Sequence, residues 1–82
     1  MHRFRLSPTI VRHGGFRLFF FSREEARAHV HVSCADGEAK FWLEPRIELA
    51  ENNGLSRMQL RSAESLVKVH HDTIRHAREH DD

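Results

Sequence analysis

The clearest pattern in the chain is the alternation of polar and apolar residues over His29-Val30-His31-Val32, followed by a second alternating run over Lys40-Phe41-Trp42-Leu43. Successive side chains of a β-strand point to opposite faces of the sheet, so the two runs predict neighbouring strands with the valines on one face and the histidines on the other. Between them, Asp36-Gly37 is the strongest short-range signal for a two-residue hairpin turn with positive φ at both positions.

This turn predicts a register in which His31 lies opposite Trp42, Ser33 opposite Lys40 and His29 opposite Glu44. One face of the hairpin is then apolar and consists of Val30, Val32, Phe41 and Leu43. The other face carries imidazoles, an amine, a carboxylate and an indole, contributed by His29, His31, Ser33, Lys40, Trp42 and Glu44. We expect the functional site on this second face.

The segment before the hairpin predicts two further strands, over residues 9–13 and 16–22, joined by a turn at Gly14-Gly15. The second of these has apolar residues on both sides, Phe19, Phe20 and Phe21 among them, which indicates a central core strand. Residues 1–7 show no periodicity and predict a flexible arm. After the hairpin, Pro45 ends the fourth strand, residues 47–50 favour a fifth, and residues 52–54 have turn chemistry.

From Ser56 the apolar period becomes that of a helix. Ser56 is a good N-cap with Gln59 at the third helical position, which predicts a reciprocal capping box, and Leu55 and Leu60 are spaced for a hydrophobic staple. An apolar stripe follows at spacings of three and four, formed by Leu60, Ala63, Val67, Ile74 and Ala77 with His70 at the missing position. The pattern predicts one amphipathic helix over residues 56–80 that packs on one face of the sheet.

These elements predict an α+β fold, in which a small antiparallel sheet of four to five strands carries one C-terminal helix on one face. At 82 residues the chain is a single domain, with the arm over 1–7, the sheet over 8–50 and the helix over 56–80. A domain this small buries only ~60% of the surface of its unfolded chain, so its stability is marginal or shared with a partner.

Composition indicates the cellular compartment and the charge of the protein. Cys34 is the only cysteine, so no internal disulfide can form, and the longest apolar run is the four residues 18–21. With no signal peptide or membrane span in the sequence, we expect a reducing cytoplasmic location. With histidine neutral the formal charge is +1, which argues against nucleic-acid binding through a broad basic surface. The eight histidines add positive charge as the pH falls toward 6.

The polar face supports catalysis as a first interpretation. His29 and His31 can act as general acid and base on an RNA phosphodiester, with Lys40 or Arg17 stabilising the charge that develops on the phosphoryl oxygens. Their spacing is a weak signal, because Cβ atoms two apart on a strand lie only ~7 Å from each other.

Three other interpretations use the same face. His29 and His31 can chelate a divalent metal, but a catalytic zinc site needs a third protein ligand, and the spacing does not select among Glu44, Glu25 and a tail histidine, so no cofactor is predicted. Alternatively, the face is a recognition surface, where Trp42 stacks on a base or fills a partner's pocket beside Ser33 and Glu44. In the plainest interpretation, Trp42 packs on His31 across the strands and both merely cover the polar side of a single-sided sheet.

The chain also resembles a bacterial family, DUF4160, through motifs in a fixed order: Pro8-Thr9-Ile10, Gly15-Phe16-Arg17, Phe20-Phe21-Ser22, His29-Val30-His31-Val32, Ala39-Lys40-Phe41-Trp42-Leu43, Pro45, Leu49-Ala50, Asn52, Gly54-Leu55 and Leu60-Arg61. The resemblance runs to about residue 67. It departs at Arg27-Ala28, where the family has two prolines, and in the histidine-rich tail.

The resemblance implies a compact cytoplasmic protein encoded beside a small protein of a second family, DUF2442, in the manner of a toxin and its antitoxin. We therefore expect a toxin-like component of a type II pair, acting on RNA through the His-x-His strand. The expected partners are the DUF2442-type antitoxin and RNA, with no membrane. The alternatives are a non-enzymatic module that binds protein or nucleic acid, and a metal-binding protein.

Overall fold

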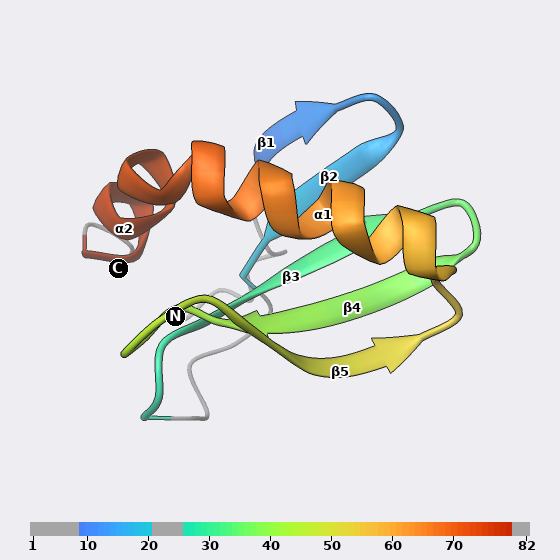
Figure 1. Cartoon of the computed structure of the whole chain (residues 1–82). Coiled ribbons are helices and arrows are strands. Elements are labelled where there is room, and N and C mark those ends of the chain that lie inside the picture. Colours follow the sequence, from blue (N-terminus) through green and yellow to red (C-terminus); the bar gives the residue numbers. More distant parts are fainter. Residues whose placement is uncertain (1–8, 21–25, 80–82) are drawn as a thin grey trace, which may run out of the picture.

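The computed structural model describes residues 9–20 and 26–79, so the predicted arm over residues 1–7 and residues 80–82 lie outside the described part. The described chain forms five strands and then two helices (Figure 1). The strands are antiparallel and lie side by side in chain order: β1 (Thr9–His13), β2 (Phe16–Phe19), β3 (His29–Cys34), β4 (Gly37–Trp42) and β5 (Glu48–Asn53). They are followed by α1 (Arg57–Val69) and α2 (His71–Glu79).

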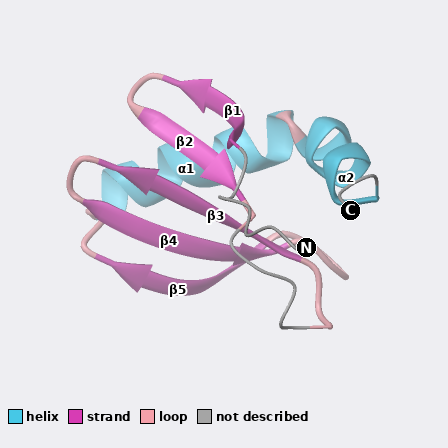
Figure 2. Cartoon of the chain, turned by 180° about the vertical axis from the view of Figure 1, so that it is seen from behind, coloured by secondary structure: helices cyan, strands magenta, loops and turns pink. Residues whose placement is uncertain are grey.

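Both helices lie on the same side of the sheet, as the two opposite views show (Figures 1 and 2). The core forms where they meet the strands, and its most deeply buried members, each no more than 1% exposed, are Leu18, Val30, Val32, Ala39, Phe41, Ala63, Val67 and Ile74. The predicted α+β fold is therefore confirmed. The four residues predicted for the apolar face of the hairpin all lie in this core.

The first hairpin forms as predicted, because Gly14 and Gly15 adopt φ values of 54° and 86° that other residues rarely reach. Strand β2 ends at Phe19, and the end of the predicted strand over residues 21–22 lies outside the described part. Strand β5 runs to Asn53, which corrects the predicted turn at Asn52-Asn53. Only Gly54, with φ of 101°, turns the chain toward α1.

The start of α1 follows the sequence prediction closely. The Ser56 hydroxyl accepts from the Gln59 backbone N–H at 3.1 Å, and the Gln59 side chain accepts from the Ser56 N–H at 2.8 Å, which completes the capping box. The predicted single helix divides at His70, whose φ and ψ of −101° and 21° end α1 before α2 begins. Neither helix has the length and apolar character needed to cross a membrane.

The register of the β3–β4 hairpin differs from the prediction by two residues. Its two-residue loop is Ala35-Asp36, with Cys34 opposite Gly37, and neither loop residue has positive φ. His31 therefore lies opposite Lys40, His29 opposite Trp42, and Ser33 opposite Glu38. The predicted pairs of His31 with Trp42, of Ser33 with Lys40 and of His29 with Glu44 are wrong.

Contacts outside the hairpin explain the shift. Gly37 belongs to β4 and lies so close to β5 that an added Cβ would collide with the backbone carbonyl of Asn53. Asp36 is held in the loop by α1, because the Gln59 side-chain amide donates to its carboxylate at 2.8 Å. Gly37 is therefore required for a close approach of two strands rather than for turn geometry.

This arrangement predicts that Gly37→Ala destabilises the protein by about 1–3 kcal/mol, because the methyl group must displace the β5 backbone. Urea unfolding at equilibrium measures the change. The matched control is Gly14→Asn in the other hairpin, where a Cβ meets nothing within 4 Å and asparagine tolerates positive φ. Equal stability of Gly37→Ala and the wild-type protein would contradict the proposed packing role.

Candidate functional site

The candidate site lies on the sheet face that points away from the helices, the face toward the viewer in Figure 2. We call it the sheet-face cluster, and it comprises Arg17 and Phe19 of β2, His29 and His31 of β3, and Lys40 and Trp42 of β4. A register shift of two residues preserves the face on which each side chain lies. The prediction that His29, His31, Lys40 and Trp42 share one face therefore survives the correction of their pairing.

His31 lies at the centre of the cluster, opposite Lys40 and stacked on Phe19 with ring centroids 5.4 Å apart and an interplanar angle of 22°. Its Nδ1 lies 3.0 Å from Oε2 of Glu38. The side chain is only 14% exposed, and this burial lowers the pKa of His31 below the ordinary value of 6.5. The Glu38 carboxylate raises the pKa of His31, whereas desolvation, His29 and Lys40 lower it, and the net direction is downward. Because a carboxylate can only accept, Nδ1–H of His31 donates to Glu38.

His29 is oriented by the backbone. Its Nδ1 lies 3.0 Å from the carbonyl oxygen of Arg27, and because a carbonyl can only accept, Nδ1 carries the hydrogen. The ring makes edge-to-face contacts on two sides, with centroid distances of 5.3 Å to His31 and 6.0 Å to Trp42. In both histidines the neutral ring therefore has Nε2 as its acceptor nitrogen.

Trp42 is packed against two cations. The Arg27 guanidinium carbon lies 4.3 Å and Lys40 Nζ 4.7 Å from the centroid of the indole ring. Arg27 also donates to the carbonyl oxygen of Glu44 at 3.0 Å and lies 3.8 Å from the Glu48 carboxylate. Lys40 is only 9% exposed, so its charge is held close to the rings instead of extending into water.

Arg17 occupies the β2 side of the face. Its guanidinium carbon lies 4.2 Å from the Phe19 ring centroid, and its Nε donates to the Thr9 hydroxyl at 2.7 Å. Its register partner on β3 is Ser33, two residues beyond His31. Lys40, as the direct cross-strand neighbour of His31, is therefore better placed than Arg17 to act beside the histidines.

The structure separates the predicted binding residues. Trp42 belongs to the cluster, and Ser33 pairs with Glu38 at its margin. Glu44 is exposed beyond the end of β4, where its backbone carbonyl accepts from Arg27. Sequence reasoning missed Phe19 and Glu38. Phe19 lies two residues from Arg17 on β2, and Glu38 lies two residues from Lys40 on β4, so strand alternation places both on this face. It also missed Arg27, which precedes β3 and carries no periodic signal.

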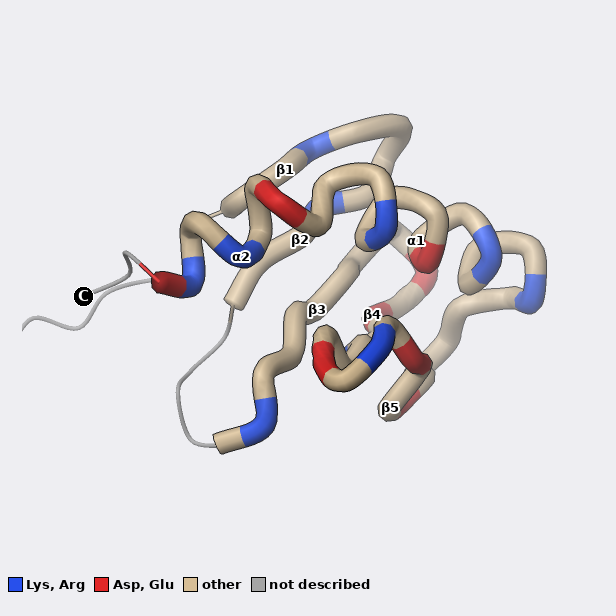
Figure 3. Tube along the Cα trace, turned by 60° about the vertical axis from the view of Figure 1, so that its left-hand side comes forward, with Lys and Arg blue, Asp and Glu red and all other residues tan. Residues whose placement is uncertain are grey.

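Two further features bear on chemistry. Among residues 9–20 and 26–79, no group of three or more His, Cys, Asp and Glu side chains is placed to hold a metal ion. Figure 3 shows positive and negative residues interspersed along the helices and strands, so the described surface is not strongly biased toward either charge. This agrees with the formal charge of +1.

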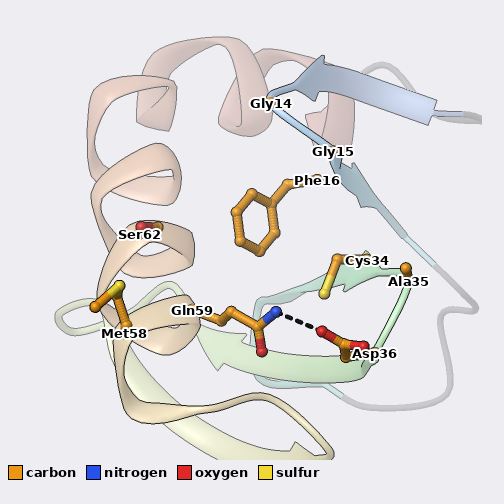
Figure 4. Close-up of a pocket in the computed structure, with 9 residues that line it drawn as sticks. All are labelled: Gly14, Gly15, Phe16, Cys34, Ala35, Asp36, Met58, Gln59 and Ser62. Atoms are coloured by element: carbon orange, nitrogen blue, oxygen red, sulfur yellow. Dashed lines mark hydrogen bonds between the residues drawn. The ribbon is translucent and has the colours of Figure 1, made fainter.

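A separate hollow of about 320 Å³ lies near the start of α1, on the helix side of the sheet. The hairpin ends and α1 line it, and Figure 4 shows the Phe16 ring and the Cys34 thiol pointing into it. At its rim, Gln59 donates to Asp36. This hydrogen bond connects the start of α1 to the β3–β4 loop.

The lowered pKa of His31 predicts a loss of stability on acidification. The unfolded chain binds a proton at His31 at higher pH than the folded chain, so the free energy of unfolding falls as pH drops below 6.5, by at most about 1.4 kcal/mol per pH unit. His31→Gln removes this component. Urea unfolding at pH 7.5, 6.5 and 5.5 measures this pH dependence, and His13→Gln on β1 is the control. An identical pH dependence of the unfolding free energy in His31→Gln and wild type would refute the prediction.

A family model described as Domain of unknown function (DUF4160) matches residues 15–77. The match begins after β1. It includes β2 to β5, α1, α2 except its last residues, and every member of the sheet-face cluster. No curated protein and no solved structure matches the chain.

Proposed function

This chain belongs to the DUF4160 family, and we propose that it is a toxin-like cytoplasmic protein that cleaves RNA by means of His31. The observation that carries the proposal is the contact of His31 Nδ1 with the Glu38 carboxylate at 3.0 Å. A carboxylate that accepts from Nδ1–H fixes the tautomer in which Nε2 can take a proton, the arrangement of a general base with its orienting group.

The reaction that suits this arrangement needs no cofactor. His31 Nε2 takes the proton of an RNA 2′-hydroxyl as its oxygen attacks the adjacent phosphorus. The bond from phosphorus to the 5′-oxygen breaks, and that oxygen receives a proton from the imidazolium form of His29, which leaves a cyclic phosphate and a 5′-hydroxyl. Lys40 stabilises the charge on the phosphoryl oxygens, and Glu38 stabilises the His31 imidazolium.

The test is induced expression in a bacterial host, with colony counts and total RNA as readouts. We expect the wild-type chain to arrest growth and fragment RNA, and His29→Ala/His31→Ala to do neither. With purified protein, His31→Ala reduces RNA turnover by about 10²-fold or more, the usual contribution of a general base.

Two variants sharpen this test. Glu38→Gln keeps the size of the side chain but weakens the orientation of His31, so we expect RNA turnover between those of wild type and His31→Ala. His13→Ala/His71→Ala removes two histidines away from the cluster and retains full turnover. Unchanged turnover in His31→Ala, or loss of turnover in the control pair, would exclude the proposed role.

A second candidate function is recognition of a partner protein, and the partial exposure of Trp42 beside Arg27 favours it. Aromatic and arginine side chains together are typical of the residues on which protein interfaces depend. The family resemblance supports a DUF2442-type antitoxin as this partner, bound on the same face as the proposed RNA site.

For this function we expect Trp42→Ala to weaken the complex with the neighbouring DUF2442-type protein by at least tenfold, as measured by calorimetry. Met58→Ala is the control, because Met58 is 75% exposed on α1 on the opposite side of the sheet. Equal affinity of Trp42→Ala and wild type would place the interface elsewhere.

A further inference from the structure

The hollow between α1 and the two hairpin ends lies on the helix side of the sheet, so it is separate from the sheet-face cluster (Figure 4). Its volume of about 320 Å³ is at the lower end of the range for small-molecule pockets, ~300–1,000 Å³. Gly14 and Gly15 form part of its wall, and a Cβ added to either would meet nothing within 4 Å. The first hairpin therefore contributes backbone to the wall and no side chain that would reduce the volume.

The interior of the hollow is apolar and contains an aromatic ring and a thiol. Phe16 and Cys34 both pack against the hydrophobic core, and Figure 4 shows the ring of one and the sulfur of the other pointing into the space. Met58 of α1 also lines the hollow and is 75% exposed, so its flexible thioether can adjust to a bound group. Sulfur atoms and aromatic rings make favourable contacts with a second ring. These walls suit an aromatic ligand.

The rim of the hollow carries one negative charge. Among the described residues that line the hollow, Asp36 is the only charged one, and it is exposed. Gln59 Nε2 donates to Asp36 Oδ2 at 2.8 Å, whereas no described residue donates to Oδ1. The Gln59 amide is itself fixed, because its oxygen accepts from the Ser56 N–H at 2.8 Å. The carboxylate is therefore held in one orientation, with Oδ1 available to a donor from a ligand.

The start of α1 opposes a cation at this rim, but the carboxylate outweighs it. Aligned peptide dipoles place only about half an elementary positive charge at a helix N-terminus, whereas Asp36 carries a full negative charge. The capping box of Ser56 and Gln59 also satisfies two backbone N–H groups that would otherwise attract an anion. The rim therefore favours a cation, and a compact ammonium group needs only one acceptor oxygen to bind there.

We propose that this hollow is a binding site for a small aromatic ammonium ion, an arylalkylamine. The ring occupies the apolar space beside Phe16, Cys34 and Met58, and the ammonium group donates to Asp36 Oδ1. We expect a Kd on the order of 1 mM, because the ligand is small and the ion pair is exposed to water. The site shares no residue with the proposed RNA chemistry. Its occupancy can therefore be measured without RNA, and the two proposals succeed or fail separately.

The first experiment titrates the wild-type protein with phenylethylammonium and follows backbone amides by ¹H–¹⁵N NMR. We expect saturable shifts at Gly15, Phe16, Cys34 and Asp36. The neutral analogue phenylethanol binds about 5- to 10-fold more weakly, because it lacks the charge that pairs with the carboxylate, and the anion phenylacetate binds more weakly still. Equal affinity of the ammonium and the alcohol, or shifts that lie outside the hollow, would overturn the proposal.

The ring is tested by butylammonium, which has the same charge and no aromatic group. We expect it to bind about fivefold more weakly than phenylethylammonium, because it makes no ring contact with Phe16 or with the two sulfur atoms. Equal affinity of the two cations would reject an aromatic ligand for this hollow.

The second experiment removes the charge of the rim. Asp36→Asn keeps an oxygen that can accept from Gln59, and it is expected to weaken phenylethylammonium binding by about 5- to 10-fold while phenylethanol binds as before. Asp72→Asn is the matched control, because Asp72 is an exposed carboxylate on α2 and the same charge is removed. The amide spectrum first shows that each variant is folded. Equal weakening by both variants would mean that overall charge determines binding, and would overturn the site.

The third experiment needs no mutation, because Cys34 is the only cysteine of the chain. Its alkylation by iodoacetamide, followed by mass spectrometry of the intact protein, reports whether the hollow is occupied. At a ligand concentration ten times its Kd, phenylethylammonium is expected to slow alkylation by about tenfold, as mass action requires. Phenylacetate at the same concentration is expected to leave the rate unchanged. Full reactivity of the thiol at saturating phenylethylammonium would place the bound cation elsewhere and contradict the proposal.

Discussion

The packing of both helices against one face of the sheet is the constraint on which the rest of this structure depends. Val30, Val32 and Phe41 of the sheet share one core with Ala63, Val67 and Ile74 of the helices, and each of these six side chains is no more than 1% exposed. Burial of these six side chains contributes roughly 25 cal/mol per Å² of apolar surface removed from water. Because strands alternate, the same burial directs His29, His31, Lys40 and Trp42 to the opposite face.

On that opposite face the side chains support each other through rings and cations. Phe19 stacks on His31, His29 contacts both His31 and Trp42, and Lys40 lies under the indole at 9% exposure. These contacts hold the imidazoles in fixed orientations, and the acceptors at Arg27 and Glu38 select the tautomer of each ring. The chemical role that we propose depends on these two tautomers, because each leaves Nε2 as the acceptor nitrogen of the neutral ring.

Much of the fold could be predicted from local pattern. Alternation located β3 and β4, the Gly14-Gly15 pair located the first turn, and Ser56 with Gln59 located the start of α1, because each signal acts between residues close in sequence. The same alternation placed four of the predicted site residues on one face. Alternation also places Glu38 on that face. Its contact with His31 was not predicted, because a carboxylate on a polar face looks like an ordinary solvated residue.

By itself, the sequence determined the α+β class, the two faces of the central hairpin and the cap of α1, since periodicity and capping depend on neighbours within about four residues. Only the tertiary structure decided which residues face each other across β3 and β4. Asp36-Gly37 has the local chemistry of a turn. In the structure, however, Gly37 packs closely on Asn53 of β5, and Asp36 accepts a hydrogen bond from Gln59 of α1. A strand can slip by two residues without changing its faces, so only packing against other elements distinguishes the two registers. The hydrogen bond of His31 to Glu38 and the position of His29 opposite Trp42 follow from those distant contacts.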